Sequence, residues 1–129
     1  MNQTDNMQEI RLNIPADMTY KPVVTLALSG LGMVLGLDVD LLGDLRTVAG
    51  ECLDCLMNQA GRPETIEMRV WKQDAGLCVQ FDAKDRERTQ PKDELALEIT
   101  RGVLETLMPE VELFVDEDGV HGILCAMPV

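Results

Sequence analysis

The chain has 129 residues and a mass of 14.3 kDa, enough for one domain with its own hydrophobic core. Hydrophobic residues make up 46% of it and charged residues 26%, which argues against a disordered chain. The 23 acidic and 11 basic side chains give a net charge of −12. This charge argues against nucleic acid and anionic membrane surfaces as partners, because both attract basic patches, and favours a basic protein partner. The most apolar stretch, residues 23–37, is broken by polar residues and glycines, so we expect neither a membrane span nor a signal peptide.

The cysteines predict a cytoplasmic protein with free thiols, because four of them occur without a secretory signal. Cys52 and Cys55 have the spacing of a redox or zinc half-site, but they fall inside an expected helix. A four-thiolate zinc site would need Cys78 and Cys125 beside them. We therefore expect the cysteines to act as small hydrophobic residues.

Hydrophobic periodicity predicts five strands and three helices in the order β-α-α-β-β-α-β-β. Residues 1–8 are expected to be a flexible N-terminus and residues 9–129 a single domain. No strand–helix–strand unit repeats, so we expect an α+β fold: a two-layer α/β sandwich with three helices on one face of a mainly antiparallel sheet. The expected strands are residues 9–15, 66–71, 77–82, 111–116 and 120–127, and the expected helices are residues 19–37, 38–59 and 91–107.

Two of the expected helices carry apolar stripes that predict how they pack. The first helix, capped by Thr19, has two stripes. One stripe is expected to face the core, and the other to stay near the surface as the interface of a homodimer; the alternative is that the third helix covers this second stripe. The core stripe is Tyr20, Val23, Val24, Ala27, Leu31 and Val34; the interface stripe is Leu26, Met33 and Leu37; the expected buried stripe of the third helix is Leu95, Ile99, Val103 and Leu107.

The second helix, capped by Asp38, combines a buried stripe with an acidic face that contains Glu51, Asp54 and Asn58. Carboxylates on one helical face recruit magnesium when nucleotide phosphates supply further oxygens, so Glu51 is a candidate general base beside a metal. The alternative is an ordinary solvated face in a very acidic protein. The expected buried stripe is Leu41, Leu45, Val48, Cys52, Leu56 and Ala60.

Over residues 9–128 the chain resembles the anti-sigma-factor serine kinases of the histidine-kinase-like ATPase superfamily (the Bergerat or GHKL fold). The family's helix motif is Glu-x-x-x-Asn with a trailing Ala, and the resemblance places Glu51 at the general base and Ala60 at the Ala. The magnesium-binding Asn position is then Cys55. A slipped register places Asp54 and Asn58 at the Glu and Asn positions, so the metal position is Asn58 or Cys55.

The nucleotide motifs of the family are altered in this chain. The resemblance makes Asp82 the acceptor of the adenine amino group, but Lys84 and Arg86 replace the two glycines that follow it. In the second glycine motif, Glu94 and Ala96 replace the two glycines that let backbone amides hold phosphate. A carboxylate beside a triphosphate is repulsive, so the resemblance implies a nucleotide cleft that is closed or altered.

These observations lead us to expect an anti-sigma-factor-like regulatory protein that binds another protein, with ATP turnover weakened or lost. The partners implied are a sigma factor or an anti-anti-sigma-like protein. ATP and magnesium would bind only if the site were active, and we expect neither to be bound. One alternative is an active ATP-dependent serine kinase that phosphorylates an anti-anti-sigma partner. The other is a small-ligand-binding domain that reuses the nucleotide cleft.

Overall fold

A computed structural model describes residues 9–58, 63–85, 94–116 and 119–128 of the chain. The sheet has five strands: β1 (Ile10–Pro15), β2 (Thr65–Gln73), β3 (Gly76–Lys84), β4 (Glu110–Asp116) and β5 (Gly119–Pro128). Their order across the sheet is β1-β2-β3-β5-β4, and every neighbouring pair is antiparallel. The strands β1 and β4 are therefore the two edges of the sheet.

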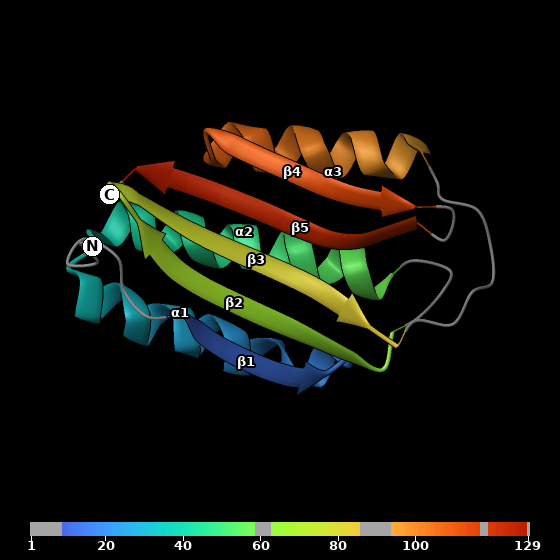
Figure 1. The fold of residues 1–129 in the computed structure, drawn as a ribbon, viewed down its shortest axis with the longest axis horizontal. Coiled ribbons are helices and arrows are strands. Elements are labelled where there is room, and N and C mark those ends of the chain that lie inside the picture. Colours follow the sequence, from blue (N-terminus) through green and yellow to red (C-terminus); the bar gives the residue numbers. More distant parts are fainter. Residues whose placement is uncertain (1–8, 59–62, 86–93, 117–118, 129) are drawn as a thin grey trace, which may run out of the picture.

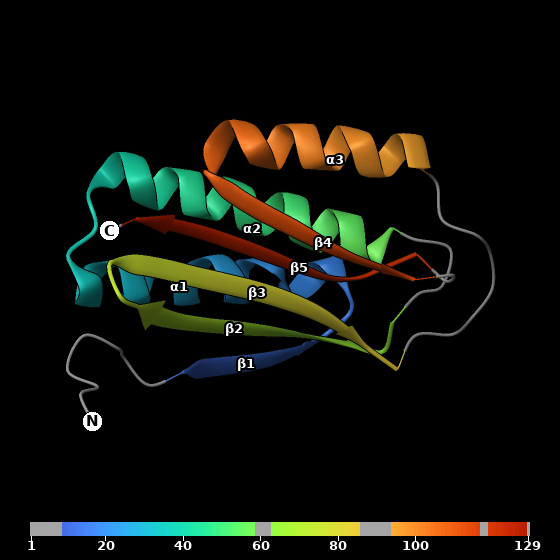
Figure 2. The ribbon, with the colours of Figure 1, turned by 45° about the horizontal axis from the view of Figure 1, so that its top comes forward.

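All three long helices lie on one face of this sheet, and the opposite face is covered by no described helix or strand (Figures 1 and 2). They are α1 (Lys21–Leu35), α2 (Val39–Met57) and α3 (Glu94–Leu107), with α2 between the other two. This confirms the expected α+β class and the three helices on one face; the sheet is antiparallel throughout. The expected N-terminal segment 1–8, together with Ala60, Arg86 and residues 91–93, lies outside the described residues.

The helix ends follow from local chemistry. Asp38 caps α2 as expected, because its side chain accepts a hydrogen bond from the backbone N–H of Leu41 at 2.8 Å. Gly36 ends α1 in the left-handed conformation, with φ of 70°. The expected cap at Thr19 is wrong: Asp17 accepts from the N–H of Thr19 at 2.9 Å and starts a short 3-10 turn, Met18–Tyr20, from which α1 continues.

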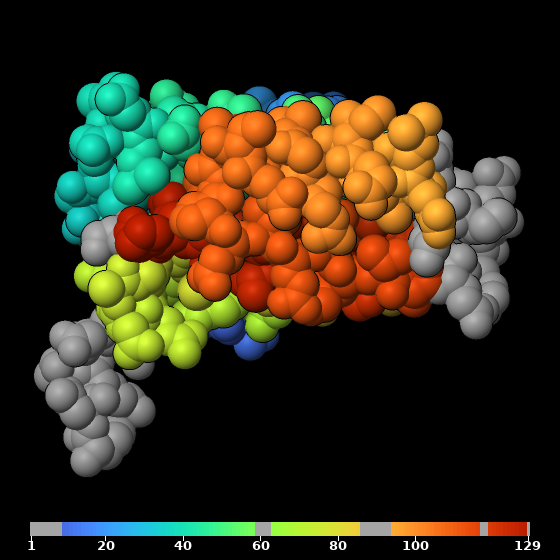
Figure 3. Space-filling model, turned by 90° about the horizontal axis from the view of Figure 1, so that it is seen from above, coloured from blue at the N-terminus to red at the C-terminus, as the bar shows by residue number. Residues whose placement is uncertain are grey.

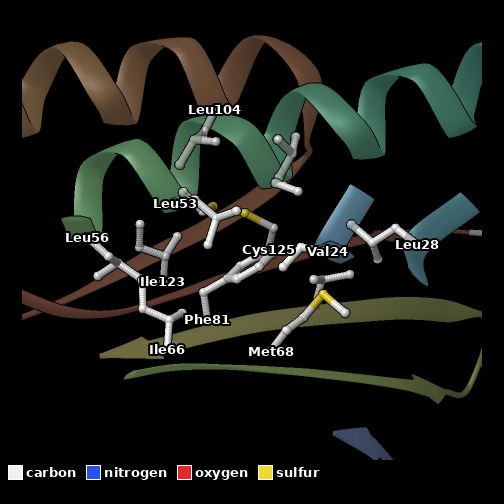
Figure 4. Packing of buried hydrophobic residues seen from close by; sticks show 14 of the residues in the cluster. Val24, Leu28, Leu53, Leu56, Ile66, Met68, Phe81, Leu104, Ile123 and Cys125 are labelled. Atoms are coloured by element: carbon white, nitrogen blue, oxygen red, sulfur yellow. The ribbon is translucent and has the colours of Figure 1, made fainter. Parts of the chain in front are cut away.

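The core lies between the helices and the sheet and has contributions from every layer (Figure 4). On the sheet, alternate residues such as Met68, Phe81 and Ile123 point toward the helices and are fully buried. On α2 the expected stripe is confirmed at Leu45, Val48, Cys52 and Leu56, while Leu41 is partly buried.

The buried face of α1 differs from the expected one. Val24, which belongs to the expected core stripe, and Leu28, which does not, are each 1% exposed, whereas Val23 and Val34 of that stripe are 44% and 82% exposed. Tyr20 is also exposed, and Ala27 and Leu31 are only partly buried. Gly32 is the third buried residue of this face and lets α2 approach closely, because a Cβ at this position would lie 2.5 Å from a methyl carbon of Leu42. A glycine that faces a neighbour adds no hydrophobic signal, so the sequence pattern placed the stripe too far round the helix.

The buried face of α3 also differs from the expected stripe. Leu95 and Ile99 are 73% and 61% exposed, and the buried side chains of this helix are Leu97 and Leu104. The helix lies at the margin of the layer, where it contacts α2 and β4. A helix at the margin of a layer is covered on one narrow side only. Apolar side chains that lie outside this side, such as Leu95 and Ile99, are therefore exposed to solvent.

The stretch Met18–Leu35 is long and apolar enough to cross a membrane by length and composition, with a mean hydropathy of 1.3 and 17% of its residues buried. From the sequence we expected no such stretch. The core helix of a water-soluble domain and a signal sequence pass the same test. In this fold the helix contributes Val24 and Leu28 to the core.

Candidate functional site

The acidic face of α2 is tied to α1 by one ion pair. Nζ of Lys21 lies 3.4 Å from Oδ1 of Asp54, and both side chains are partly exposed. Gly50 makes this contact possible, because a Cβ at this position would meet the Lys21 side chain at 3.2 Å. Asp54 therefore joins two helices, a role that the sequence motif did not indicate.

The remaining residues of the expected motif occupy different surroundings on α2. Glu51 is half-buried, and no ion pair to it is found among the described residues. Cys55 packs against the hydrophobic core. Asn58 is exposed and ends the helix with a hydrogen bond from its backbone N–H to the carbonyl of Asp54 at 3.0 Å. Glu51, Cys55 and Asn58 therefore lie in three different environments.

Asp82 lies on the open face of the sheet, opposite the helices. Its Oδ2 accepts a hydrogen bond from Nη2 of Arg69 at 3.0 Å, and its Oδ1 accepts one from Nε2 of Gln80 at 3.0 Å. The preceding residue, Phe81, is fully buried on the helix side, so strand alternation directs Asp82 the other way. Both oxygens of this carboxylate are engaged by neighbouring side chains.

The structure does not bring the expected nucleotide residues into one site. The sheet separates Asp82 from Glu51, which belongs to the helix layer. Lys84 lies 3.9 Å from Glu67 on the open face, and Glu94 and Ala96 are exposed in the first turn of α3. An adenine held by Asp82 would be on the other side of the sheet from a base at Glu51, so these residues do not fit ATP and magnesium as one bound group.

The described residues contain no cluster of three or more His, Cys, Asp or Glu side chains arranged to hold a metal ion. A four-thiolate site is excluded by geometry for the same part of the chain, because Cys78 belongs to the open face whereas Cys52 and Cys125 are buried in the core. All four cysteines are free. Hydrogen bonding between the buried pair raises the pKa of Cys52, together with its burial, and lowers the pKa of Cys125.

Arg69, which no sequence motif indicated, is the centre of the polar network on the open face. Besides Asp82, its guanidinium lies 3.6 Å from Glu9 and 3.8 Å from Glu67 and sits 5.8 Å from the ring centre of Trp71. The hydrophobic alternation of the sequence could have shown this grouping. It places Glu67, Arg69 and Trp71 of β2 on the same face of the sheet as Gln80 and Asp82 of β3. Glu67 is almost completely buried under this network.

Comparison with known proteins adds no family to this description. No protein-family model matches the chain, and a search of curated proteins finds no match.

Proposed function

We propose that this chain is a cytoplasmic, anti-sigma-factor-like regulatory protein of the histidine-kinase-like ATPase fold, which acts by binding another protein and in which ATP turnover is weakened or lost. The resemblance in motif order over residues 9–128 supports the fold. The separation of Glu51 from Asp82 by the sheet supports the loss of ATP turnover. Free cysteines throughout the chain support a reducing compartment.

The observation that carries the protein-binding function is the apolar outer face of α1. Leu26, Met33 and Val34 are 72%, 80% and 82% exposed, and Tyr20 and Val23 extend the same surface. We call these five residues the α1 apolar face. Contiguous exposed apolar side chains on a soluble domain mark interaction sites, because burying them against a partner is favourable in free energy.

This face is also suited to a second copy of the chain. Lys21 is the only charged residue in α1, so two copies can meet there without the repulsion expected elsewhere between molecules of charge −12. Gly30 has open space around it and allows close approach of a second helix. Leu37, the third residue of the expected interface, packs partly against the core instead. We therefore propose a homodimer centred on Leu26 and Met33.

The homodimer is tested with the double variant Leu26→Glu/Met33→Glu and the matched control Leu95→Glu/Ile99→Glu, which places the same charges on the exposed face of α3. Multi-angle light scattering should give a dimer for the unmodified chain and the control, and a monomer with unchanged circular dichroism for the α1 variant. A monomeric unmodified chain at high concentration would contradict the homodimer.

ATP binding is tested separately by the shift in melting temperature with millimolar ATP and magnesium. The proposal predicts no shift, because a chain that does not bind the nucleotide gains no stability from it by mass action. A clear shift, together with phosphate transfer to an anti-anti-sigma protein, would establish the active kinase instead.

The partner class is tested against the sigma factors and anti-anti-sigma proteins of the source genome, each offered as a purified protein in a surface-binding assay. One of them should bind with a Kd near or below micromolar, as regulatory interfaces of ordinary size do. Binding of none of them would remove the anti-sigma-like assignment.

A further inference from the structure

The strand β4 leaves one side of the sheet open. It pairs with β5 only, so alternate backbone N–H and C=O groups along Glu110–Asp116 point away from the sheet. Figure 3 looks onto this side of the molecule, where α3 and β4 lie in front and no described segment covers the strand. An unpaired edge of this kind can add an extended segment of another protein as a further strand.

A hollow of about 370 Å³ lies against the first half of β4, where α3 ends. Leu124 and Ala126 of β5 line it from the open face, and Val111 of β4 lines it from the helix side, where its side chain packs partly against the core. Three carboxylates surround it: Glu105, Glu110 and Glu112. An apolar wall bordered by negative charge matches the side chain of a lysine or arginine, whose long stem is apolar and whose end is cationic.

No cation in the described part of the chain pairs with the three carboxylates. Among the described residues, none of Glu105, Glu110 and Glu112 forms an ion pair or a side-chain hydrogen bond. By contrast, the acidic residues of the open face near β1 and β2 are paired with Arg11, Arg69 or Lys84. No described residue supplies the positive charge that would balance these carboxylates, and a basic partner can supply it.

The spacing of these groups fits a strand rather than a helix. Glu110 and Glu112 are two residues apart on β4 and point to the same face, opposite Ala126 and Leu124 of β5. In an added strand, residues i and i+2 would stand beside them, since side chains on one face of a sheet repeat every two residues.

We propose that the free edge of β4 and the hollow beside it bind an extended segment of a partner protein that carries lysine or arginine at alternate positions. Backbone pairing with β4 supplies the alignment, and Glu110 and Glu112 select the basic side chains that the added strand directs to the open face. This surface is separate from the α1 apolar face, which lies at the other margin of the helix layer. The two proposals can therefore fail independently.

The probe is a fluorescein-labelled peptide, acetylated and amidated, of six residues that alternate lysine and threonine. Fluorescence anisotropy at low salt measures its binding to the unmodified chain. The variant that removes two charges beside the hollow is Glu110→Gln/Glu112→Gln, called the groove variant below. The matched control is Glu64→Gln/Asp85→Asn, which removes the same charge from exposed residues at the opposite end of the sheet. A second peptide carries N-methyl groups on its threonines, so that it keeps its charge but loses the N–H groups that pair with a strand.

We expect the groove variant to weaken binding roughly tenfold, the sum of two exposed charge pairs, and the control to weaken it no more than about twofold. The N-methylated peptide should bind at least tenfold more weakly than its parent. Equal losses in the groove variant and the control would show attraction to net charge alone and overturn the proposal. Equal binding of both peptides would exclude strand addition. No binding to the unmodified chain, with aggregation of the groove variant, would mean that the glutamates only protect the edge from self-pairing.

Discussion

Gly122 on β5 makes room for the carboxylate of Asp82, which faces it across the β3–β5 pair. A Cβ at residue 122 would lie 2.7 Å from Oδ1 of Asp82 and 3.1 Å from a ring carbon of Phe114. Because Arg69 and Gln80 hold this carboxylate, it cannot move aside without losing a partner. The absence of a side chain at residue 122 is therefore a condition for the polar network on the open face.

Gly122→Ala should lower the free energy of unfolding by about 1–3 kcal/mol, because the added methyl group overpacks a filled space. The matched control is Gly102→Ala on α3, where a Cβ would meet nothing within 4 Å. This control should raise stability by about 0.5–1 kcal/mol through helix propensity. Urea denaturation followed by circular dichroism measures both, and equal stability of Gly122→Ala and the unmodified chain would mean that Asp82 moves freely.

Asp82→Ala should destabilise the fold, since it removes a charged hydrogen-bond acceptor from partly buried Arg69. The expected loss is about 1.5–3 kcal/mol. Glu64→Ala, at an exposed position with no side-chain partner among the described residues, should change stability by less than about 0.5 kcal/mol. Chemical denaturation compares the two. A role in adenine binding would instead appear as a lost ATP response with stability unchanged.

The orientation of α3 is tested by two substitutions of the same kind in one helix. Leu104→Ala should cost about 2–5 kcal/mol, because Leu104 is fully buried and its removal leaves a cavity. Leu95→Ala should change stability by less than about 0.5 kcal/mol, because that side chain is mostly in solvent. Thermal and urea unfolding give both values. A larger loss of stability for Leu95→Ala than for Leu104→Ala would mean that α3 buries the stripe expected from the sequence.

Cys78 should react slowly with iodoacetamide at pH 8. Partial burial raises the pKa of its thiol, and the negative charge of Glu110 raises it further. Less thiolate is then present below that pKa, and thiolate is the reactive form. Glu110→Gln should lower the pKa and speed the alkylation of Cys78. Peptide mass spectrometry resolves this cysteine from the others, and Glu64→Gln serves as the control that should leave the rate unchanged.

The sequence by itself determined the elements and most of the sheet. Period-two alternation in β2 and β3 and the cap at Asp38 are local effects, decided by a residue and its near neighbours, and the structure confirms them. The buried stripe of α2 was also predictable, because this helix lies in the middle of its layer and is covered on a wide face.

Only the tertiary structure decided which faces of α1 and α3 are buried and which side chains meet. Gly32 lets Leu42 of the next helix approach α1 closely, and such a contact leaves no hydrophobic periodicity in the sequence of either helix. The position of Asp82 shows the same limit. Its alternation with Phe81 was readable in the sequence, but the separation from Glu51 follows from the packing of all helices on the side of Phe81. A motif aligned along a chain assumes a shared pocket, and the sheet between these two carboxylates places them in separate environments.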